Sequence, residues 1–158
     1  MGYHVGLLSE IPISNSLFLR IELAYHLKGF MFPSNFYNSG GIVGLNYISL
    51  PVLVRPKTSR RLSLVAGPEF GYLAYAKSRF SGSNYDITRN LRKFDFVLNV
   101  GPAIEFNDAV GLELRYGYGL LIIQDEAIFD SNGNSLGRAQ VGPNRTLQLS
   151  LVYKFAKN

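Results

Sequence analysis

The side chains that could do chemistry in this sequence are two histidines, a nearby lysine and scattered carboxylates. His4 and His26 are the only histidines, Lys28 follows the second of them, and cysteine is absent. A nucleophilic triad needs a general base, and a transition-metal site needs several converging nitrogen or oxygen ligands. Two facing histidines could bind a metal ion, although such a pair more often lines a polar cavity. We therefore expect no catalytic residue, no metal site and no cofactor.

A strict alternation of apolar and polar residues indicates which elements must position these side chains. In AVGLELRYGYGLLII (109–123), leucines and tyrosines alternate with glycines, Glu113 and Arg115. A period of two is typical of a β-strand with two unlike faces. We find no helical period and no sign of a second domain, so we expect one all-β domain over residues 1–158. The pattern recurs in seven expected strands, at 3–11, 16–29, 47–55, 61–77, 93–106, 109–123 and 145–155.

The connections between these strands alternate between short and long. Outer-membrane barrels have short periplasmic turns and longer extracellular loops, and strands of roughly 9–11 residues suit a tilted membrane strand. We therefore predict an antiparallel up-and-down transmembrane β-barrel in the outer membrane, with seven strands visible of eight. The short connections are 13–16, 56–60 and 107–109, and the long ones are 29–41, 78–92 and 125–144.

The two faces of the strands differ in a way that favours lipid outside the barrel. The apolar faces are continuous and would aggregate in water, whereas a small barrel can enclose charges that pair with one another. The residues expected to face lipid include Leu112, Leu114, Tyr116, Leu149 and Leu151. The polar network expected in the lumen comprises Arg20, Glu22, Glu69, Asp95, Glu105, Glu113 and Arg115.

Three short motifs are the most specific parts of the strands: ISLPVL (48–53), AGPEFGYL (66–73) and the terminal YKF (153–155). With HVGLLSEIPISNSLFLRIELAYHLKG, FDFVLNVGPAIEF and GLELRYGYGL, they resemble the PorT-like outer-membrane β-barrel family of Bacteroidota. That family often has an acidic residue where Ser49 stands. The resemblance covers nearly the whole chain and implies an OmpA-like eight-stranded barrel in the outer membrane. Because PorT itself is an accessory of type IX secretion, envelope or secretion proteins are candidate partners.

The net charge of +5 would suit an anionic partner, but the basic residues are scattered along the chain. Nucleic-acid binding would need them on one exposed face among aromatic residues, so we expect no nucleic acid. Arg55 is expected in a periplasmic turn. We expect outer-membrane lipid around the barrel. Basic residues at its outer rim could hold lipopolysaccharide phosphates by charge-assisted bonds. The bases expected at the outer rim are Lys77, Arg79, Arg89, Arg92 and Lys93.

These observations predict a non-enzymatic barrel with a side-chain-plugged lumen and a structural or accessory role. Eight strands leave an interior just wide enough for side chains to fill. The alternatives are a narrow pore, a lipid-modifying barrel enzyme that uses His4, His26 and Lys28, and a soluble lipocalin-like binding barrel. The lipocalin alternative would reverse the two faces and normally carries a Trp, which this chain lacks.

Turn lengths also predict strand registers. A turn centred on Asn15 places Glu10 opposite Arg20 and His4 opposite His26. A three-residue turn at 107–109 places Gly101 opposite Arg115 and Ala103 opposite Glu113.

Strand directions predict an open edge. With seven alternating strands, 3–11 and 145–155 run the same way, so the outer edge of 3–11 should lack an antiparallel neighbour. We expect a truncated barrel whose eighth strand, with a signal peptide, lies before Met1.

Overall fold

The computed structural model describes residues 2–32, 41–80, 83–129 and 135–155, almost all of them in β-strands. The alternating pattern explains this high strand content, because each strand can bury its polar face while its apolar face remains exposed. The elements are β1 (Tyr3–Ser14), β2 (Leu17–Phe32), β3 (Gly41–Pro56), β4 (Leu62–Phe80), β5 (Ser83–Asp86), the 3₁₀ turn η1 (Thr88–Asn90), β6 (Phe94–Glu105), β7 (Val110–Phe129) and β8 (Ser135–Tyr153).

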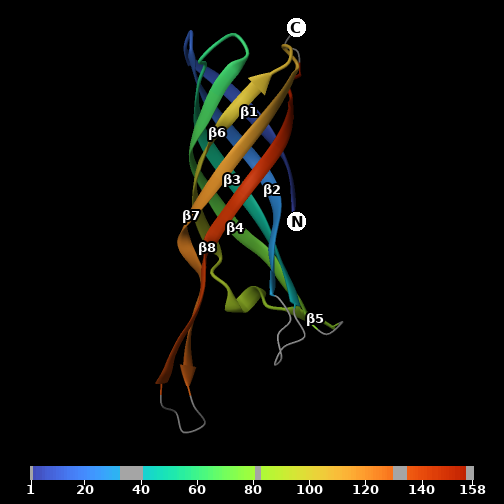
Figure 1. Cartoon of the computed structure of the whole chain (residues 1–158), viewed down its shortest axis with the longest axis vertical. Helices are drawn as coiled ribbons and strands as arrows, with labels where there is room; N and C mark the ends of the chain where they lie inside the picture. Colours follow the sequence, from blue (N-terminus) through green and yellow to red (C-terminus); the bar gives the residue numbers. More distant parts are fainter. Residues whose placement is uncertain (1, 33–40, 81–82, 130–134, 156–158) are drawn as a thin grey trace.

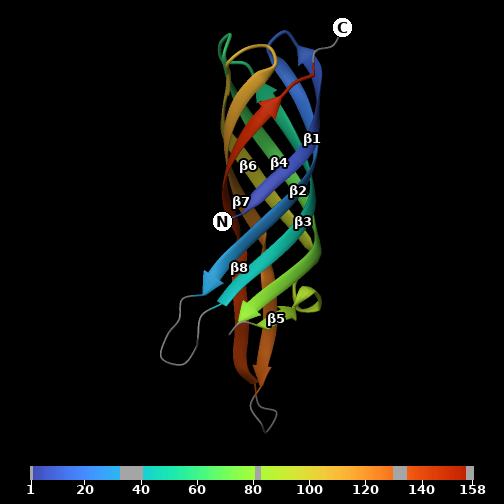
Figure 2. The ribbon, with the colours of Figure 1, turned by 90° about the vertical axis from the view of Figure 1, so that its right-hand side faces the viewer.

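The strands form one antiparallel sheet in which each long strand pairs with the next one along the chain. The order is β1-β2-β3-β4-β6-β7-β8, and the short β5 pairs with β4. The sheet coils into a tall barrel (Figures 1 and 2). The connections at 15–16, 57–61 and 106–109 lie at one end, which we call the short-turn end, and the long loops lie at the other, the long-loop end. The predicted up-and-down topology is confirmed.

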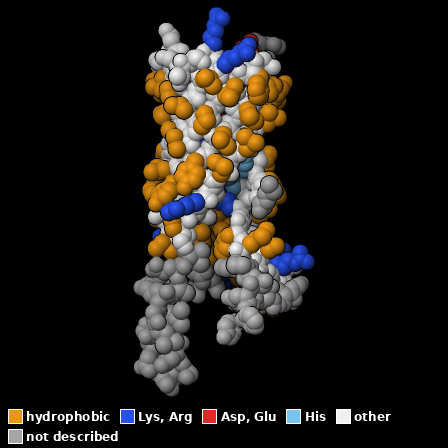
Figure 3. Space-filling model, viewed as in Figure 1, with side chains coloured by type: hydrophobic (Ala, Val, Ile, Leu, Met, Phe, Trp, Pro, Cys, Tyr) orange, Lys and Arg blue, Asp and Glu red, His pale blue; other side chains and the backbone are white. Residues whose placement is uncertain are grey.

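The barrel carries its apolar face outside and its charges inside. The exposed fraction is 65% for Leu149 and 74% for Leu151, but only 1% for both Arg20 and Glu113. Leu114 and Tyr116 are also exposed, and Leu112 is half-buried. Figure 3 shows the apolar side chains that cover the barrel on the face in view. The predicted orientation of the two faces is therefore confirmed.

The registers predicted from turn lengths are also confirmed. The paired residues are Glu10 with Arg20, His4 with His26, and Ala103 with Glu113. Gly101 lies against the backbone of Arg115, since a Cβ built on this glycine would be 2.8 Å from the Arg115 Cα. The missing side chain of Gly101 thus lets the backbones of β6 and β7 approach closely.

The strands at the long-loop end are longer than the sequence pattern indicates. Most of the connection expected at 125–144 is strand, because β7 continues to Phe129 and β8 begins at Ser135. The ladder pairs Asp125 with Gln140 and Ala127 with Arg138. Antiparallel pairing satisfies the backbone here without an alternating sequence. None of the described residues forms a helix long and apolar enough to cross a membrane.

The first and last strands of the sheet do not pair with each other. In the described part of the chain, β1 pairs only with β2 and β8 only with β7. We call the gap between β1 and β8 the seam. The prediction that the outer edge of strand 3–11 lacks an antiparallel neighbour is confirmed for these residues.

Candidate functional site

The centre of the lumen holds a cluster of two arginines and two glutamates, which we call the central cluster. Arg20 comes from β2 and reaches across to Glu113 on β7, with 2.5 Å between Nη1 and Oε2. Arg115 donates to both carboxylate oxygens of Glu22, at 3.0 and 2.8 Å, and also pairs with Glu113. Because β2 and β7 are not neighbours in the sheet, the pairs of Arg20 with Glu113 and of Arg115 with Glu22 cross the lumen, whereas Arg115 and Glu113 pair along β7.

A second cluster, the short-turn cluster, lies nearer the short-turn end. Arg55 donates from Nη1 to Glu10 at 3.0 Å and from Nη2 to Glu105 at 2.7 Å. Lys154 pairs with the same two carboxylates, and Glu10 links this cluster to Arg20 at 2.7 Å. The placement of Arg55 in a turn was wrong. Its side chain is only 1% exposed, because β3 extends through Pro56 and odd-numbered residues of that strand face inward.

The pairing within these clusters is what allows charges to be buried. A buried ion is costly unless it has both an opposite charge and hydrogen bonds to its remaining polar atoms. Each arginine here has two or three carboxylate partners, and each carboxylate has at least two cations. We infer that the clusters behave as one network rather than as separate pairs.

The two histidines face each other on the long-loop side of the central cluster. Their rings stack with centroids 5.4 Å apart and an interplanar angle of 16°. His4 Nε2 lies 2.8 Å from Ser150 Oγ, which is across the seam on β8. Among the described residues, no group of three or more His, Cys, Asp or Glu side chains is arranged to hold a metal ion.

A third group, the long-loop cluster, lies on the long-loop side of the histidines. Lys28 Nζ is 3.4 Å from Glu69 and 3.6 Å from Asp95, and it lies over the ring of Tyr47. Asn99 donates to Glu69 at 2.9 Å, and Asn144 donates to Asp95 at 2.7 Å. The lysine considered for catalysis is therefore buried and paired with two carboxylates. All residues of the expected polar network lie inside the barrel, with Glu22 and Glu105 half-buried.

Close packing surrounds these polar groups on the β7–β8 wall. A Cβ built on Gly117 would lie 2.6 Å from Thr146 Oγ1 and 3.0 Å from Asn99 Oδ1. Glycine is needed at this position because the space over its Cα is already filled by two polar side chains.

An apolar cluster of buried residues, which we call the cap, lies at the long-loop end of the barrel. The alternating pattern gave no sign of it, because Leu91 lies in an expected loop. The Ala76 amide donates to the Thr88 hydroxyl at 2.9 Å, and the Ile87 amide donates to the Ala76 carbonyl at 3.1 Å. With the Arg92 amide, which donates to the Ile123 carbonyl at 2.8 Å, these bonds fix the loop. The cap comprises Val43, Leu45, Tyr47, Leu73, Ala76, Leu91 and Ile123.

The five bases predicted at the rim lie around the segment 83–93. Lys77 pairs in register with Asp86, and its ammonium lies 5.1 Å from the centre of the Tyr75 ring. The hydroxyl and amide of Thr88 donate to Asp86 Oδ1, which lowers the pKa of that carboxyl, and the nearby Arg89 and Lys93 lower it further. Lys77, Arg89 and Lys93 therefore lie near the Asp86 carboxylate.

Comparison with known protein families decides which kind of barrel this is. Residues 1–123 match the family described as "Outer membrane protein beta-barrel domain". The chain belongs to this family. No match was found among curated proteins. As an outer-membrane β-barrel, the chain faces lipid with its exposed apolar series, and its short-turn end faces the periplasm.

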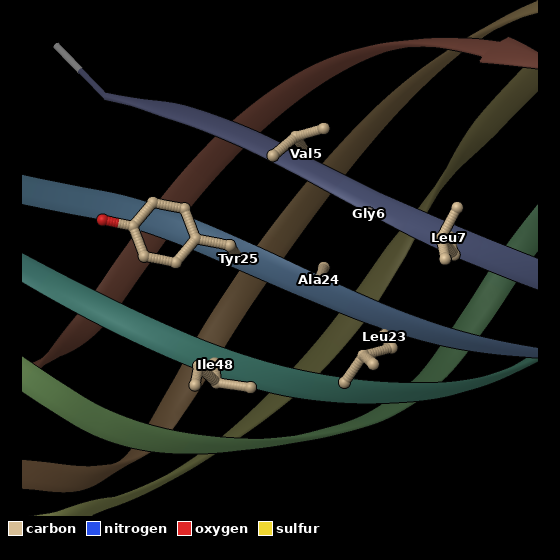
Figure 4. Close-up of a pocket in the computed structure, with 7 residues that line it drawn as sticks. All are labelled: Val5, Gly6, Leu7, Leu23, Ala24, Tyr25 and Ile48. Carbon is tan, nitrogen blue, oxygen red and sulfur yellow. The ribbon is translucent and has the colours of Figure 1, made fainter.

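The lipid-facing surface of this outer-membrane barrel has one shallow apolar hollow of about 310 Å³ (Figure 4). Val5 and Leu7 flank Gly6 on β1, and Leu23 and Tyr25 lie beside them on β2. The Tyr25 hydroxyl donates to Asn46 Oδ1. The hollow lies outside the barrel wall, away from the charged clusters, and carries no group suited to catalysis.

Proposed function

We propose that this outer-membrane barrel is non-enzymatic, that side chains plug its lumen, and that it has a structural or accessory role in the envelope. The observation that carries the proposal is the charged network that crosses the lumen from Arg20 and Arg115 to the glutamates of the opposite wall. The similarity of the sequence to PorT-like barrels supports an accessory role beside secretion or envelope proteins.

The geometry supports a closed interior for two reasons. An ion that entered the central cluster would have to displace buried ion pairs, which leaves charges without partners. It would also have to pass the cap, where Leu45 and Leu73 are at most 1% exposed. A hydrophobic constriction opposes hydrated ions, because they must shed water to enter it.

Single-channel recording in planar bilayers tests this proposal. The native chain is expected to show no steady conductance. A variant with Arg20→Ala, Arg115→Ala and Leu91→Ala, which weakens both the central cluster and the cap, is expected to show frequent openings. Arg60→Ala with Arg61→Ala, in the exposed β3–β4 turn, is the matched control and should remain closed. Steady ohmic conductance by the native chain would instead show that the protein is a narrow pore.

The bases near segment 83–93 support a second proposal, that the rim binds the phosphates of anionic lipid. Arg79, Arg89 and Arg92 are exposed at the end of the barrel where the outer leaflet lies. Arginine can donate two parallel hydrogen bonds to a phosphate. Replacing Arg79 and Arg89 with alanine should weaken the retention of lipopolysaccharide on the purified barrel, whereas replacing Arg60 and Arg61 should not. Equal retention of lipopolysaccharide by both double variants would contradict this proposal.

A further inference from the structure

The β3–β4 turn at the short-turn end carries basic side chains that the lumen network does not use. Lys57, Arg60 and Arg61 are all exposed there. None of the three takes part in an ion pair with another described residue. In the described turns at this end, the exposed acidic residue is Asp108. The surface that faces the periplasm therefore carries an excess of positive charge.

Hydrogen bonds hold the backbone of this turn in one conformation. The amides of Thr58 and Ser59 donate to the Leu62 carbonyl at 2.9 and 3.0 Å, and the Leu62 amide donates to Ser59 Oγ at 3.1 Å. The Lys57 amide donates to the Ser16 carbonyl at 2.8 Å, which ties the turn to the neighbouring β1–β2 turn. Because the backbone is already ordered, a partner that binds here pays little to order it.

An exposed aromatic residue lies on the adjacent turn. The Glu105 amide donates to the Arg61 carbonyl at 2.8 Å, so the β3–β4 turn lies beside the β6–β7 turn. Phe106 is the next residue and is 54% exposed. Arginine and aromatic residues are the types enriched at the centres of protein–protein interfaces. We call Arg60, Arg61 and Phe106 the periplasmic patch.

The arginines of the periplasmic patch differ from the bases at the opposite end of the barrel. Arg89 at the long-loop rim lies near the Asp86 carboxylate, whereas Arg60 and Arg61 have no carboxylate partner among the described residues. A guanidinium without a partner presents its fork of donors to an incoming carboxylate. Figure 3 shows Lys or Arg side chains that stand at the short-turn end beyond the apolar side chains. This placement favours a partner from the aqueous periplasm over the phosphates of the bilayer.

We propose that the periplasmic patch binds an acidic, extended segment of a periplasmic protein. Arg60 and Arg61 each donate to a carboxylate of that segment, and Phe106 contacts an apolar side chain beside those carboxylates. Charge-assisted hydrogen bonds from the two arginines supply the specificity for acidic residues. The inference names the kind of partner that the accessory role requires, and in this respect it rests on the proposed function.

Fluorescence anisotropy of a labelled acidic peptide tests the proposal. The probe is a short synthetic peptide in which several glutamates and one leucine are set among glycine and serine, and its control has glutamine in place of every glutamate. The barrel is held in nanodiscs of phosphatidylcholine, which has no net charge and leaves both ends of the barrel accessible. The test variants are Arg60→Ala with Arg61→Ala, and Phe106→Ser. The matched control is Arg79→Ala with Arg89→Ala, which removes the same charge at the long-loop end.

The expected result is a dissociation constant for the acidic peptide that rises at least about tenfold with Arg60→Ala and Arg61→Ala, and about threefold with Phe106→Ser. The control pair should change it by less than about twofold, and the glutamine peptide should bind the native barrel at least about tenfold more weakly.

Equal effects of the two double variants, or equal binding of the two peptides, would overturn the proposal. So would a loss of phosphatidylglycerol retention by Arg60→Ala with Arg61→Ala while the peptide affinity stays the same, because lipid phosphate would then be the occupant. A native barrel that stays closed in bilayer recording but does not bind the peptide would refute this inference alone. A native barrel that conducts but still binds the peptide would refute only the plugged lumen.

Discussion

Replacing Arg20 with alanine removes the side chain that links the central cluster to the short-turn cluster. Arg20 donates to Glu10 at 2.9 and 2.7 Å and to Glu113 at 2.5 Å, and it lies 3.4 Å from Glu22. Arg20 is 1% exposed. Alanine therefore leaves three carboxylates with fewer partners inside the barrel.

The size of the effect follows from the partners that remain. Removing one member of a buried ion pair typically costs about 3–5 kcal/mol, because it leaves an uncompensated charge. Here Glu113 and Glu22 keep Arg115, and Glu10 keeps Arg55. We therefore expect a loss near the lower limit, about 3 kcal/mol in the free energy of unfolding, or about a hundredfold in the unfolding equilibrium.

Urea titration of the barrel in lipid vesicles measures this loss. The chain has no Trp, so unfolding is followed by far-ultraviolet circular dichroism. Arg61→Ala, in an exposed turn, is the matched control and should change the free energy by no more than about 0.5 kcal/mol. Combining Arg20→Met with Glu113→Gln should recover part of the loss, because it removes a charge from each side of the pair. An equal effect of Arg20→Ala and Arg61→Ala would refute the reasoning.

Three further predictions concern packing and the cap. Gly117→Ala should destabilise the barrel by about 1–3 kcal/mol, measured by the same titration, because its Cβ would overpack the wall. Gly142→Ala, whose Cβ would meet nothing within 4 Å, should be nearly neutral. Leu91→Ala should cost about 2 kcal/mol and speed amide exchange in segment 83–93, and unchanged exchange would argue against the cap. Asp86→Asn should speed tryptic cleavage in that segment at neutral pH, because the hydrogen bonds from Thr88 favour the charged carboxylate. Since the folded pKa of Asp86 is lowered, this stabilisation is present above the ordinary carboxyl pKa and is lost as the pH falls through the folded pKa. Cleavage that changes neither with Asp86→Asn nor with pH would contradict the prediction.

The alternation of residue types was enough to predict the faces of the barrel, the lumen position of Glu113 and Arg115, and the register that brings Glu10 to Arg20. Periodicity and turn length act locally, so they can be read from one strand and its turn. The same reasoning predicted that His4 faces His26 and that the outer edge of β1 lacks a partner, and both hold among the described residues.

The features that sequence reasoning missed depend on contacts between distant elements. Leu91 lies in a loop whose composition gives no sign that it folds back under the barrel mouth onto Leu45 and Leu73. Arg55 was expected in a turn, although its position in the alternation of β3 already pointed inward. The long β7–β8 hairpin has a mixed sequence, and only its mutual pairing keeps it in strand conformation.

The orientation of the two faces is the central claim of this account, and a single tryptophan tests it most directly. Leu149→Trp would place the only tryptophan of the chain on the exposed outer face of β8, and Phe106→Trp would place it in a short turn outside the belt. In vesicles of lipids with brominated acyl chains, the account predicts strong quenching for Leu149→Trp and weak quenching for Phe106→Trp. Equal, weak quenching at both positions would contradict a lipid-facing apolar series and with it the membrane barrel.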